Sequence, residues 1–249
     1  MIIIKNDKEI DLMRIAGRIV AETLLLVEKK VKPGITTAEL DRIAEEFITK
    51  HGAKPSFKGL YGFPASLCIS VNEQVVHGIP GGYVLKEGDI ISVDCGAHIN
   101  GFHGDAARTF AVGNISEEAK RLIKVTEESF FKGLEFAKVG NKLTDISHEI
   151  QHYVEASGFS VVRDFVGHGI GRSVHEDPEI PNFGRPGRGP KLVAGMTLAI
   201  EPMVNMGTYR VATLGDDWTV VSADKSLSAH YENTVVILPD GPEILTLIK

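Results

Sequence analysis

Cysteine is scarce in this chain of 249 residues. Cys68 and Cys95 are its only cysteines, and they do not form a Cys-x-x-Cys motif. A disulfide framework is therefore not expected, and neither is a structural zinc site built on thiolates. We predict that both cysteines are reduced.

Long apolar runs and charge of a single sign are absent as well. Residues 1–4 are apolar, but Lys5 follows at once, and no later stretch approaches the roughly 18 residues that a membrane span needs. The 27 basic and 33 acidic residues give a net charge of -6 without a run of five like charges, so neither a membrane nor a nucleic acid is an expected partner. With 43% hydrophobic residues the sequence is typical of a globular protein, which we expect in the cytoplasm.

The sequence resembles itself at an offset of 106 residues, in segments 33–52 and 139–158. Gly34 and Gly140 stand at equivalent places, where each can close a preceding helix, and a threonine just beyond each can cap the next helix. Apolar residues at helical spacing between Leu40 and Ile48 predict that second helix. We therefore expect a single domain of two halves, roughly 1–112 and 113–249, each beginning with two helices.

The rest of each half is rich in short β-type runs bounded by glycine and proline. These runs cover residues 66–71, 89–95, 108–112, 197–200, 218–221 and 233–238. Helices segregated from an antiparallel-rich sheet predict an α+β fold, with the strands of both halves in one sheet and the helices packed behind it.

Residues 178–190 fit neither a helix nor a strand pattern. Their four prolines and three glycines predict a long loop. Because a loop of that length in a compact domain is often functional, we expect it to border the site.

Asp94 is the one acid inside the apolar run 90–95, where an ionised carboxylate is costly unless a cation or hydrogen-bond donors compensate it. The pair Asn100-Gly101 predicts a type I′ hairpin turn, which would place Asp94 opposite Ala107. Asp105 would then be a diagonal neighbour on the same face, and both carboxylates would point into one pocket. Asp105 also follows a glycine, a position where an aspartate commonly serves only to form a turn.

The second half repeats this pattern. Glu201 is the only acid in the apolar run 196–204 and lies 107 residues after Asp94, within one residue of the helical offset. Glu232, beside the expected strand 233–238, is the counterpart of Asp105. Four converging acids would repel one another and raise their pKa values unless cations lie between them. The sequence therefore predicts two divalent metal ions and a hydrolytic site.

One of the nine histidines stands out as a metal ligand. His168 lies among the three glycines of segment 167–171, where no neighbouring side chain shields the imidazole. One imidazole with several carboxylates is an oxygen-rich set that suits Mn, Fe(II), Co or Zn. His77 and His175 lie beside glycine-rich or proline-rich turns and could serve as hydrogen-bond donors at the rim. Because a lone histidine is commonly a surface or core residue, the remaining six are assigned no role: His51, His98, His103, His148, His152 and His230.

These acids and His168, in this order, form a highly specific pattern. The strings that carry it are Val93-Asp94-Cys95-Gly96, Gly104-Asp105, Gly167-His168-Gly169-Ile170-Gly171, Ile200-Glu201-Pro202 and Tyr231-Glu232-Asn233-Thr234. Over essentially the whole chain the pattern closely resembles type I methionine aminopeptidases. The resemblance implies a pita-bread fold with pseudo-two-fold symmetry, as a single catalytic domain over residues 1–249. It also implies removal of the initiator methionine from new proteins whose second residue is small.

The resemblance assigns a place to each metal ligand. Asp105 and Glu232 would bridge two divalent ions, Asp94 would chelate one of them, and His168 and Glu201 would complete the other. The bound ions would generate a metal-bound hydroxide that attacks the carbonyl of the N-terminal methionine.

Catalytic roles also follow from the resemblance. Glu201 would accept the proton of the attacking water, and His175 would stabilise the developing oxyanion. His77 would contact the scissile amide nitrogen and assist the departing amine. Asp94 and its metal would face the free α-amino group, which restricts cleavage to a chain end.

The methionine pocket that the resemblance implies is apolar and snug. Its substrate-binding residues would be Phe57, Leu60, Phe63, Cys68, His77, Val174, His175 and Trp218. Related bacterial members often carry cysteine at the place of Phe57 and tyrosine at the places of Leu60 and Phe63, so the pocket of this chain should differ in size. Without the resemblance, ordinary core packing accounts equally well for the apolar side chains.

Three alternatives share the ligand set or the fold. Prolidases and X-prolyl aminopeptidases carry a large N-terminal domain, and Asp94 comes too early for one. Type II enzymes have a helical insertion in the second half, whereas only 30 residues separate Glu201 from Glu232. Some pita-bread proteins are binding modules that have lost their ligands, but all five are present here. We expect a monomeric type I enzyme that acts on N-terminal peptides of newly made proteins, and ribosome association is a hypothesis from the origin of that substrate.

Overall fold

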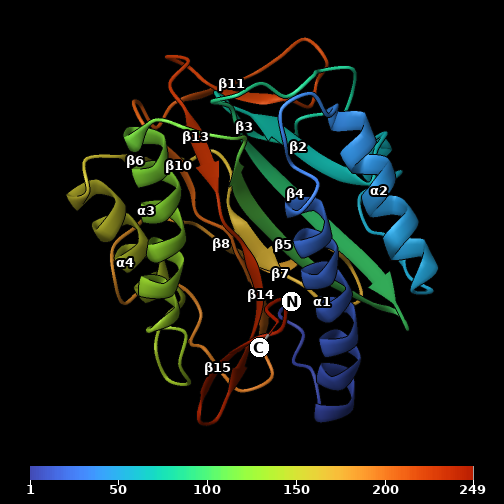
Figure 1. The fold of residues 1–249 in the computed structure, drawn as a ribbon. Helices are drawn as coiled ribbons and strands as arrows, with labels where there is room; N and C mark the ends of the chain where they lie inside the picture. Colours follow the sequence, from blue (N-terminus) through green and yellow to red (C-terminus); the bar gives the residue numbers. More distant parts are fainter. Residues whose placement is uncertain (249) are drawn as a thin grey trace.

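The structure is a computed structural model that describes residues 1–248. Two pairs of helices cover one face of the β-structure, one pair from each half of the chain (Figure 1). These helices are α1 (Asp7–Glu28), α2 (Thr37–Lys50), α3 (Glu117–Leu134) and α4 (Leu143–Ala156). The starts of α2 and α4 lie 106 residues apart, the offset of the sequence repeat. Among the helices of residues 1–248, none combines the length and hydropathy that a membrane-spanning helix needs.

The helix ends differ in part from the sequence predictions. Thr36 caps α2 as expected, because its side chain accepts the Glu39 N–H at 3.1 Å. The corresponding prediction for α4 is wrong: its N-cap is Lys142, whose N–H donates to the Asp145 carboxylate at 2.8 Å. Gly34 and Gly140 do not close helices either, since α1 and α3 have already ended at Glu28 and Leu134. Both glycines instead adopt positive φ in the turns before α2 and α4.

Fifteen strands are present in the described chain, with one short 3-10 helix, η1 (Leu60–Gly62). Those of the first half are β1 (Lys54–Pro55), β2 (Leu67–Val71), β3 (Gln74–Val76), β4 (Ile90–Ile99) and β5 (Phe102–Ala111). Those of the second half are β6 (Ser160–Val161), β7 (Gly167–Gly169), β8 (Glu176–Ile180), β9 (Thr197–Ile200), β10 (Met203–Asn205), β11 (Val211–Thr213), β12 (Val220–Ser222), β13 (Ser228–His230), β14 (Asn233–Leu238) and β15 (Gly241–Ile244). The strands at 197–200 and 233–238 match their predictions, whereas β12 begins two residues later than predicted.

The strands form four antiparallel sheets rather than the single sheet that the sequence suggested. The largest has the order β15-β14-β9-β7-β8, and in the first half β4 pairs with β1, β2 and β5. One of the small sheets crosses between the halves, since β3 pairs with β12. A second link joins Ala107 of β5 to Glu232, whose backbone groups exchange hydrogen bonds at 3.0 and 3.3 Å. The two halves are therefore joined through hydrogen bonds that flank the acidic positions.

The hairpin between β4 and β5 has the predicted geometry. Asn100 and Gly101 both have positive φ, at 54° and 81°, as a type I′ turn requires. The resulting register pairs Asp94 with Ala107 and Gly96 with Asp105, which confirms the predicted pairing.

The loop prediction for residues 178–190 is wrong at its start. Pro178 lies inside β8, an edge strand, where a residue without an N–H breaks no ladder hydrogen bond. The remainder packs against the first turn of α4: Leu143 donates its N–H to Pro190 O at 3.0 Å, and Thr144 Oγ1 donates to Arg188 O at 3.0 Å. These residues fix the start of α4. The segment also borders the acidic residues, as predicted, because Glu179 lines the same cavity as they do and Asn182 Nδ2 donates to Glu201 O at 3.0 Å.

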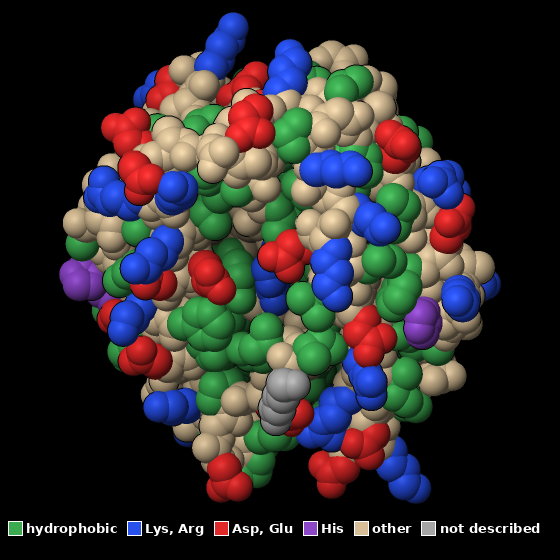
Figure 2. Space-filling view, in the orientation of Figure 1, with side chains coloured by type: hydrophobic (Ala, Val, Ile, Leu, Met, Phe, Trp, Pro, Cys, Tyr) green, Lys and Arg blue, Asp and Glu red, His purple; other side chains and the backbone are tan. Residues whose placement is uncertain are grey.

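Two large apolar clusters hold the helix pairs against the strands. One buries Leu122 of α3 and Ile146 of α4 against Leu198 of β9, and the other buries Leu24 and Leu40 of α1 and α2 against the strands of the first half. Hydrophobic side chains also gather between the helix pairs on the face shown in Figure 2. A cavity of about 440 Å³ lies among residues of α1, α3 and β5, including Leu24 and Ile123. Residues 246–248 at the end of the described chain also line this cavity.

Candidate metal centre

The β4–β5 hairpin and the largest sheet carry the five predicted ligands to one place. Asp94 and Asp105 come from β4 and β5, and His168 from the centre of β7. Glu201 directly follows β9 and Glu232 directly precedes β14. Because β9 and β14 pair antiparallel, with Ile200 opposite Asn233, the two glutamates are neighbours across the ladder ends.

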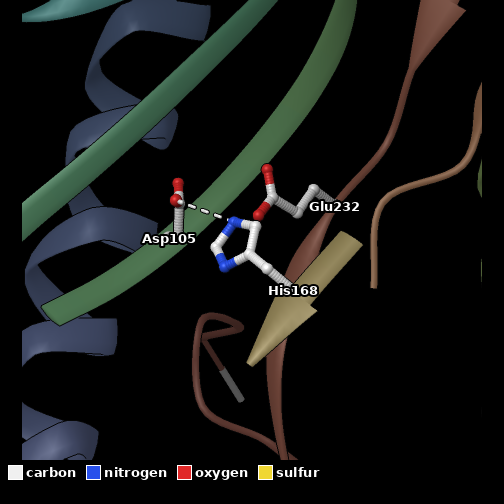
Figure 3. Close-up of side chains that lie close together, drawn as sticks. All are labelled: Asp105, His168 and Glu232. Atoms are coloured by element: carbon white, nitrogen blue, oxygen red, sulfur yellow. Dashed lines mark ion pairs between the residues drawn. The ribbon is translucent and has the colours of Figure 1, made fainter. Parts of the chain in front are cut away.

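The side chains face one another across a short gap. His168 Nε2 lies 3.5 Å from Glu201 Oε1 and 4.0 Å from Asp105 Oδ2. Figure 3 shows His168 between Asp105 and Glu232, and one ligand atom from each of these three lies within 4.8 Å of the others. Such spacing allows a single cation to contact several of them.

The imidazole of His168 is held in the form that a metal requires. Its Nδ1 lies 2.9 Å from Gly169 O, and since a carbonyl only accepts, Nδ1 carries the proton and donates it. The lone pair on Nε2 therefore faces the carboxylates, as in most metal-ligating histidines. Burial lowers the pKa of His168 to about 4, so the ring is neutral near pH 7.

No lysine or arginine of the described chain pairs with the ionised form of the four acids. Burial raises the pKa of Asp94 to about 7, and burial first and neighbouring carboxylates second raise the pKa values of Asp105, Glu201 and Glu232 well above their ordinary range. Within residues 1–248, no lysine or arginine forms an ion pair with any of the four. Arg108, the nearest candidate, donates to the backbone oxygens of Ala107 and Glu232 instead.

Among residues 1–248, several buried carboxylate oxygens have no hydrogen-bond partner, as expected where a cation binds. Within the described chain, Asp94 Oδ1, Asp105 Oδ1 and Glu232 Oε1 are buried and have no hydrogen-bond partner. Leaving such atoms unpaired is costly, whereas divalent cations would satisfy them all. The donor set therefore fits divalent metal ions.

His230 belongs to this cluster, although the sequence prediction gave it no role. Its Nε2 lies 3.8 Å from Glu201 Oε2 and 3.9 Å from Glu232 Oε2 and has no hydrogen-bond partner in residues 1–248. Burial lowers its pKa to about 3, so it is neutral. The available signal was its position two residues before Glu232, which puts both side chains on one face of an extended chain.

A cavity of about 650 Å³ opens onto the metal cluster. Of the predicted substrate-binding residues, those that line it are Phe57, Leu60, Phe63, Cys68, His77, His175 and Trp218. Val174 packs behind this wall in the same apolar cluster as Phe57 and Phe63. The sequence prediction missed Tyr61, Phe165 and Met203, which also line the cavity. Phe165 and Met203 lie within three residues of the ligands His168 and Glu201, which is the signal that could have found them.

His77 and His175 stand at the rim of the cluster. His77 has a positive φ of 59°, and the following Gly78 has no room for a Cβ, which would lie 2.2 Å from Ile69 O. Burial lowers the pKa of His77 to about 4 and also lowers that of His175. The His175 ring meets that of His168 edge-on, with centroids 4.5 Å apart, and stacks on Tyr61 at 5.9 Å. Both are therefore neutral hydrogen-bonding groups beside the carboxylates.

Buried carboxylates, an oriented imidazole and an adjoining cavity are the elements of a metal-dependent hydrolase. Residues 11–239 match the model of metallopeptidase family M24. The chain is 79% identical to a methionine aminopeptidase of Clostridium perfringens over the full length of both proteins. The chain therefore belongs to metallopeptidase family M24 and, within it, to the methionine aminopeptidases.

Solved structures agree with this assignment. The crystal structure of methionine aminopeptidase from Thermotoga maritima superposes with a TM-score of 0.98 at 49% identity, and all of both chains is covered. The prolidase from Pyrococcus furiosus shares the fold, with a TM-score of 0.82, but at 23% identity and over only 66% of its own length. These matches confirm the α+β pita-bread fold, and the chain is a metal-dependent aminopeptidase of this family.

Proposed function

We propose that this chain removes the initiator methionine from newly made proteins whose second residue is small. The observation that carries the proposal is the cluster of acidic side chains around His168 and His230, which no lysine or arginine of the described chain neutralises. The cluster lies beside a cavity with an apolar wall. Such a wall can bind the methionine side chain while the peptide bond after methionine lies at the metal ligands.

Asp94, Asp105, His168, Glu201 and Glu232 would hold two divalent ions. Mn, Fe(II), Co and Zn all suit this oxygen-rich set with one imidazole. When bound, such ions supply a Lewis acid and lower the pKa of water toward neutrality. The unpaired oxygens of Asp94, Asp105 and Glu232 support this assignment.

Glu201 is the proposed general base. Its carboxylate adjoins both His168 and His230, which places it to accept a proton from water and return it to the leaving amine. His175, next to His168 on the cavity wall, would donate a hydrogen bond to the oxyanion that develops on the scissile carbonyl. His77 would contact the scissile amide nitrogen. Because both rings are neutral, they can donate without adding positive charge beside the metals.

The methionine side chain would lie against the apolar wall of the cavity. Phe57, Phe63 and Cys68 form that wall together with the partly buried Leu60 and Trp218, and Val174 supports it from behind. The Phe63 and Trp218 rings meet edge-on with centroids 5.1 Å apart, which gives a rigid surface for a thioether.

We propose a single catalytic domain over residues 1–249, made of two repeated halves that meet at about residue 112. This arrangement explains why both halves supply ligands. We further propose that the enzyme acts as a monomer on N-terminal peptides in the cytoplasm, where proteins are made. Ribosome association follows from the same substrate, and co-sedimentation with translating ribosomes at physiological salt tests it.

The proposed activity can be tested with the peptide Met-Ala-Ser and metal-stripped enzyme. We expect release of methionine only after Mn²⁺ or Co²⁺ is added, and no release by His168→Ala. His98→Ala, which changes a histidine outside the cluster, is the matched control and should remain active. A peptide with Xaa-Pro at the cut site should stay intact, since its cleavage would favour a prolidase. If micromolar wild-type enzyme released no methionine with either metal, a binding module would be the better interpretation.

A further inference from the structure

Lys5 makes an ion pair that is almost fully removed from solvent. Its Nζ lies 2.5 Å from Glu176 Oε2, and the two side chains are 2% and 6% exposed. The same ammonium donates to Ile3 O at 3.2 Å, and the Lys5 N–H donates to Gly195 O at 2.8 Å. The N-terminal segment is therefore anchored beside β8 by a buried ion pair.

The other oxygen of Glu176 organises the turn that leads to His175. Glu176 Oε1 accepts the N–H of Arg172 at 2.8 Å and that of Ser173 at 3.2 Å. Gly171 packs against the Lys5–Glu176 pair so closely that no side chain fits there. A Cβ at this position would lie 2.4 Å from Lys5 Cε and 2.7 Å from Glu176 Oε1. One carboxylate thus connects Lys5 to the turn at 171–173, and Glu176 is the direct neighbour of His175 in the chain.

We propose that the Lys5–Glu176 pair positions His175 for catalysis. This inference rests on the function proposed above for His175. The His175 ring lies between His168 and Tyr61, and Glu176 itself lines the cavity, so a shift of the turn moves the imidazole relative to the reacting carbonyl. A misplacement of about 1 Å can lower a rate by about 10²-fold. Lys5 and Glu176 are positioning residues, since they act through His175.

The test compares Lys5→Met with Lys5→Arg and a control ion pair. Lys5→Met keeps the length of the side chain but removes the charge, whereas Lys5→Arg keeps the charge. Arg14→Met breaks the pair between Arg14 and Glu243, whose closest atoms are 2.6 Å apart and which lies between α1 and β15 outside the cavity lining. For each variant, kcat and KM for Met-Ala-Ser, bound metal and unfolding temperature are measured.

We expect Lys5→Met to lower kcat by about 10- to 100-fold with KM changed less than threefold, because an oxyanion donor acts only in the transition state. Bound metal should be unchanged, and Lys5→Arg should recover most of the rate. Arg14→Met should keep wild-type kcat even if its unfolding temperature falls. The inference is overturned if Lys5→Met keeps kcat within twofold of wild type, if it loses metal in proportion to rate, or if Arg14→Met loses as much rate. An inactive wild type would instead refute the proposed function.

A second, independent inference concerns the outer side of α4. The segment His148-Glu149-Ile150-Gln151-His152 has two histidines four residues apart, which places them on one face of the helix. Their rings are nearly parallel, at 9°, with centroids 6.1 Å apart. His148 Nδ1 lies 3.3 Å from Gly184 O, so it donates its proton there and leaves the lone pair on Nε2.

We propose that His148 and His152 chelate one borderline divalent cation at the surface. Two histidines at this spacing on a helix form the metal-binding part of the His-Glu-x-x-His motif. Within residues 1–248, no group of three ligating side chains at metal-binding distance includes this pair. Water molecules would complete the coordination of the cation. We expect this site to bind metal only and to have no catalytic role. The affinity should follow the order Cu²⁺ above Ni²⁺, as for most nitrogen ligands.

Immobilised metal resin tests this site directly, because the buried catalytic cluster cannot reach a resin-bound ion. Untagged protein should be retained on immobilised Ni²⁺ and need more imidazole for elution from Cu²⁺ resin. His152→Gln should elute at clearly lower imidazole than wild type, and His51→Gln, which removes the exposed histidine just after α2, should elute as wild type does. Equal elution of His152→Gln and wild type, or no retention of wild type, would overturn the proposal.

Discussion

Metal-free protein should become less stable as the pH rises above 6.5. Asp94 has a folded-state pKa of about 7, and those of Asp105, Glu201 and Glu232 are raised well above their ordinary values, mainly by burial. In the unfolded chain these groups ionise near pH 4. The folded state therefore holds protons that the unfolded state has released, and a rise in pH favours unfolding.

The buried histidines confine this effect to a pH window. The pKa values of His77, His103 and His168 are lowered to about 4, and that of His230 to about 3, first by burial. Unfolded histidine takes up its proton near pH 6.5, so a rise in pH up to that value stabilises the folded chain and opposes the carboxylates. Unfolded histidine is half protonated at pH 6.5 and loses nearly all of its remaining protons by about pH 7.5, so the opposing contribution fades over that interval and the carboxylates dominate above it.

Each carboxyl group that keeps its proton in the folded state lowers the free energy of unfolding by about 1.4 kcal/mol per pH unit. Urea unfolding in EDTA at pH 6.5, 7.2 and 8.0, followed by the fluorescence of Trp218, measures this slope. We expect a loss of at least about 1.4 kcal/mol per pH unit without metal and little or no loss with saturating Mn²⁺, because bound cations keep the carboxylates ionised.

Two variants separate the metal cluster from the rest of the protein. Glu232→Gln removes one of the groups whose pKa is raised in the folded state and should make the slope in EDTA shallower. Glu117→Gln, on the exposed first turn of α3, is the matched control and should leave the slope unchanged. A free energy of unfolding that stays flat or rises between pH 6.5 and 8.0 in EDTA would refute the reasoning.

Three further changes test the cavity, the cluster and the core. Phe63→Ala removes part of the apolar wall and should lower kcat/KM for Met-Ala-Ser by about 10- to 100-fold, and an unchanged value would contradict the proposed pocket. His230→Ala should weaken metal binding by about 10- to 100-fold in equilibrium dialysis, because its Nε2 adjoins two ligands, and wild-type affinity would show that it has no part in holding the metals. Leu198→Ala, at a fully buried position of β9, should lower the free energy of unfolding by about 2 to 5 kcal/mol in urea, whereas a loss below about 1 kcal/mol would show that the core relaxes around it.

Local sequence determined the parts of the protein that depend on backbone conformation and side-chain period. Asn100-Gly101 specifies a turn with positive φ at both positions, and that turn alone fixes the register that pairs Asp94 with Ala107. The apolar run around Asp94 showed that this acid needs compensation, and the run around Glu201 showed the same in the second half. The resemblance to a known family then supplied the order of the ligands.

Only the tertiary structure revealed contacts between segments far apart in the chain. Lys5 and Glu176 are 171 residues apart, and nothing in either neighbourhood indicates a buried pair. His230 was not predicted as a neighbour of Glu201, because its spacing from Glu232 relates it only to that residue, and its approach to Glu201 depends on how β13 and β10 pair. The loop after β8 packs on the start of α4, another contact between distant segments that no local pattern indicates. Turns and periodicities are set by neighbouring residues, whereas burial and ion pairing depend on which surfaces meet when the two halves pack together.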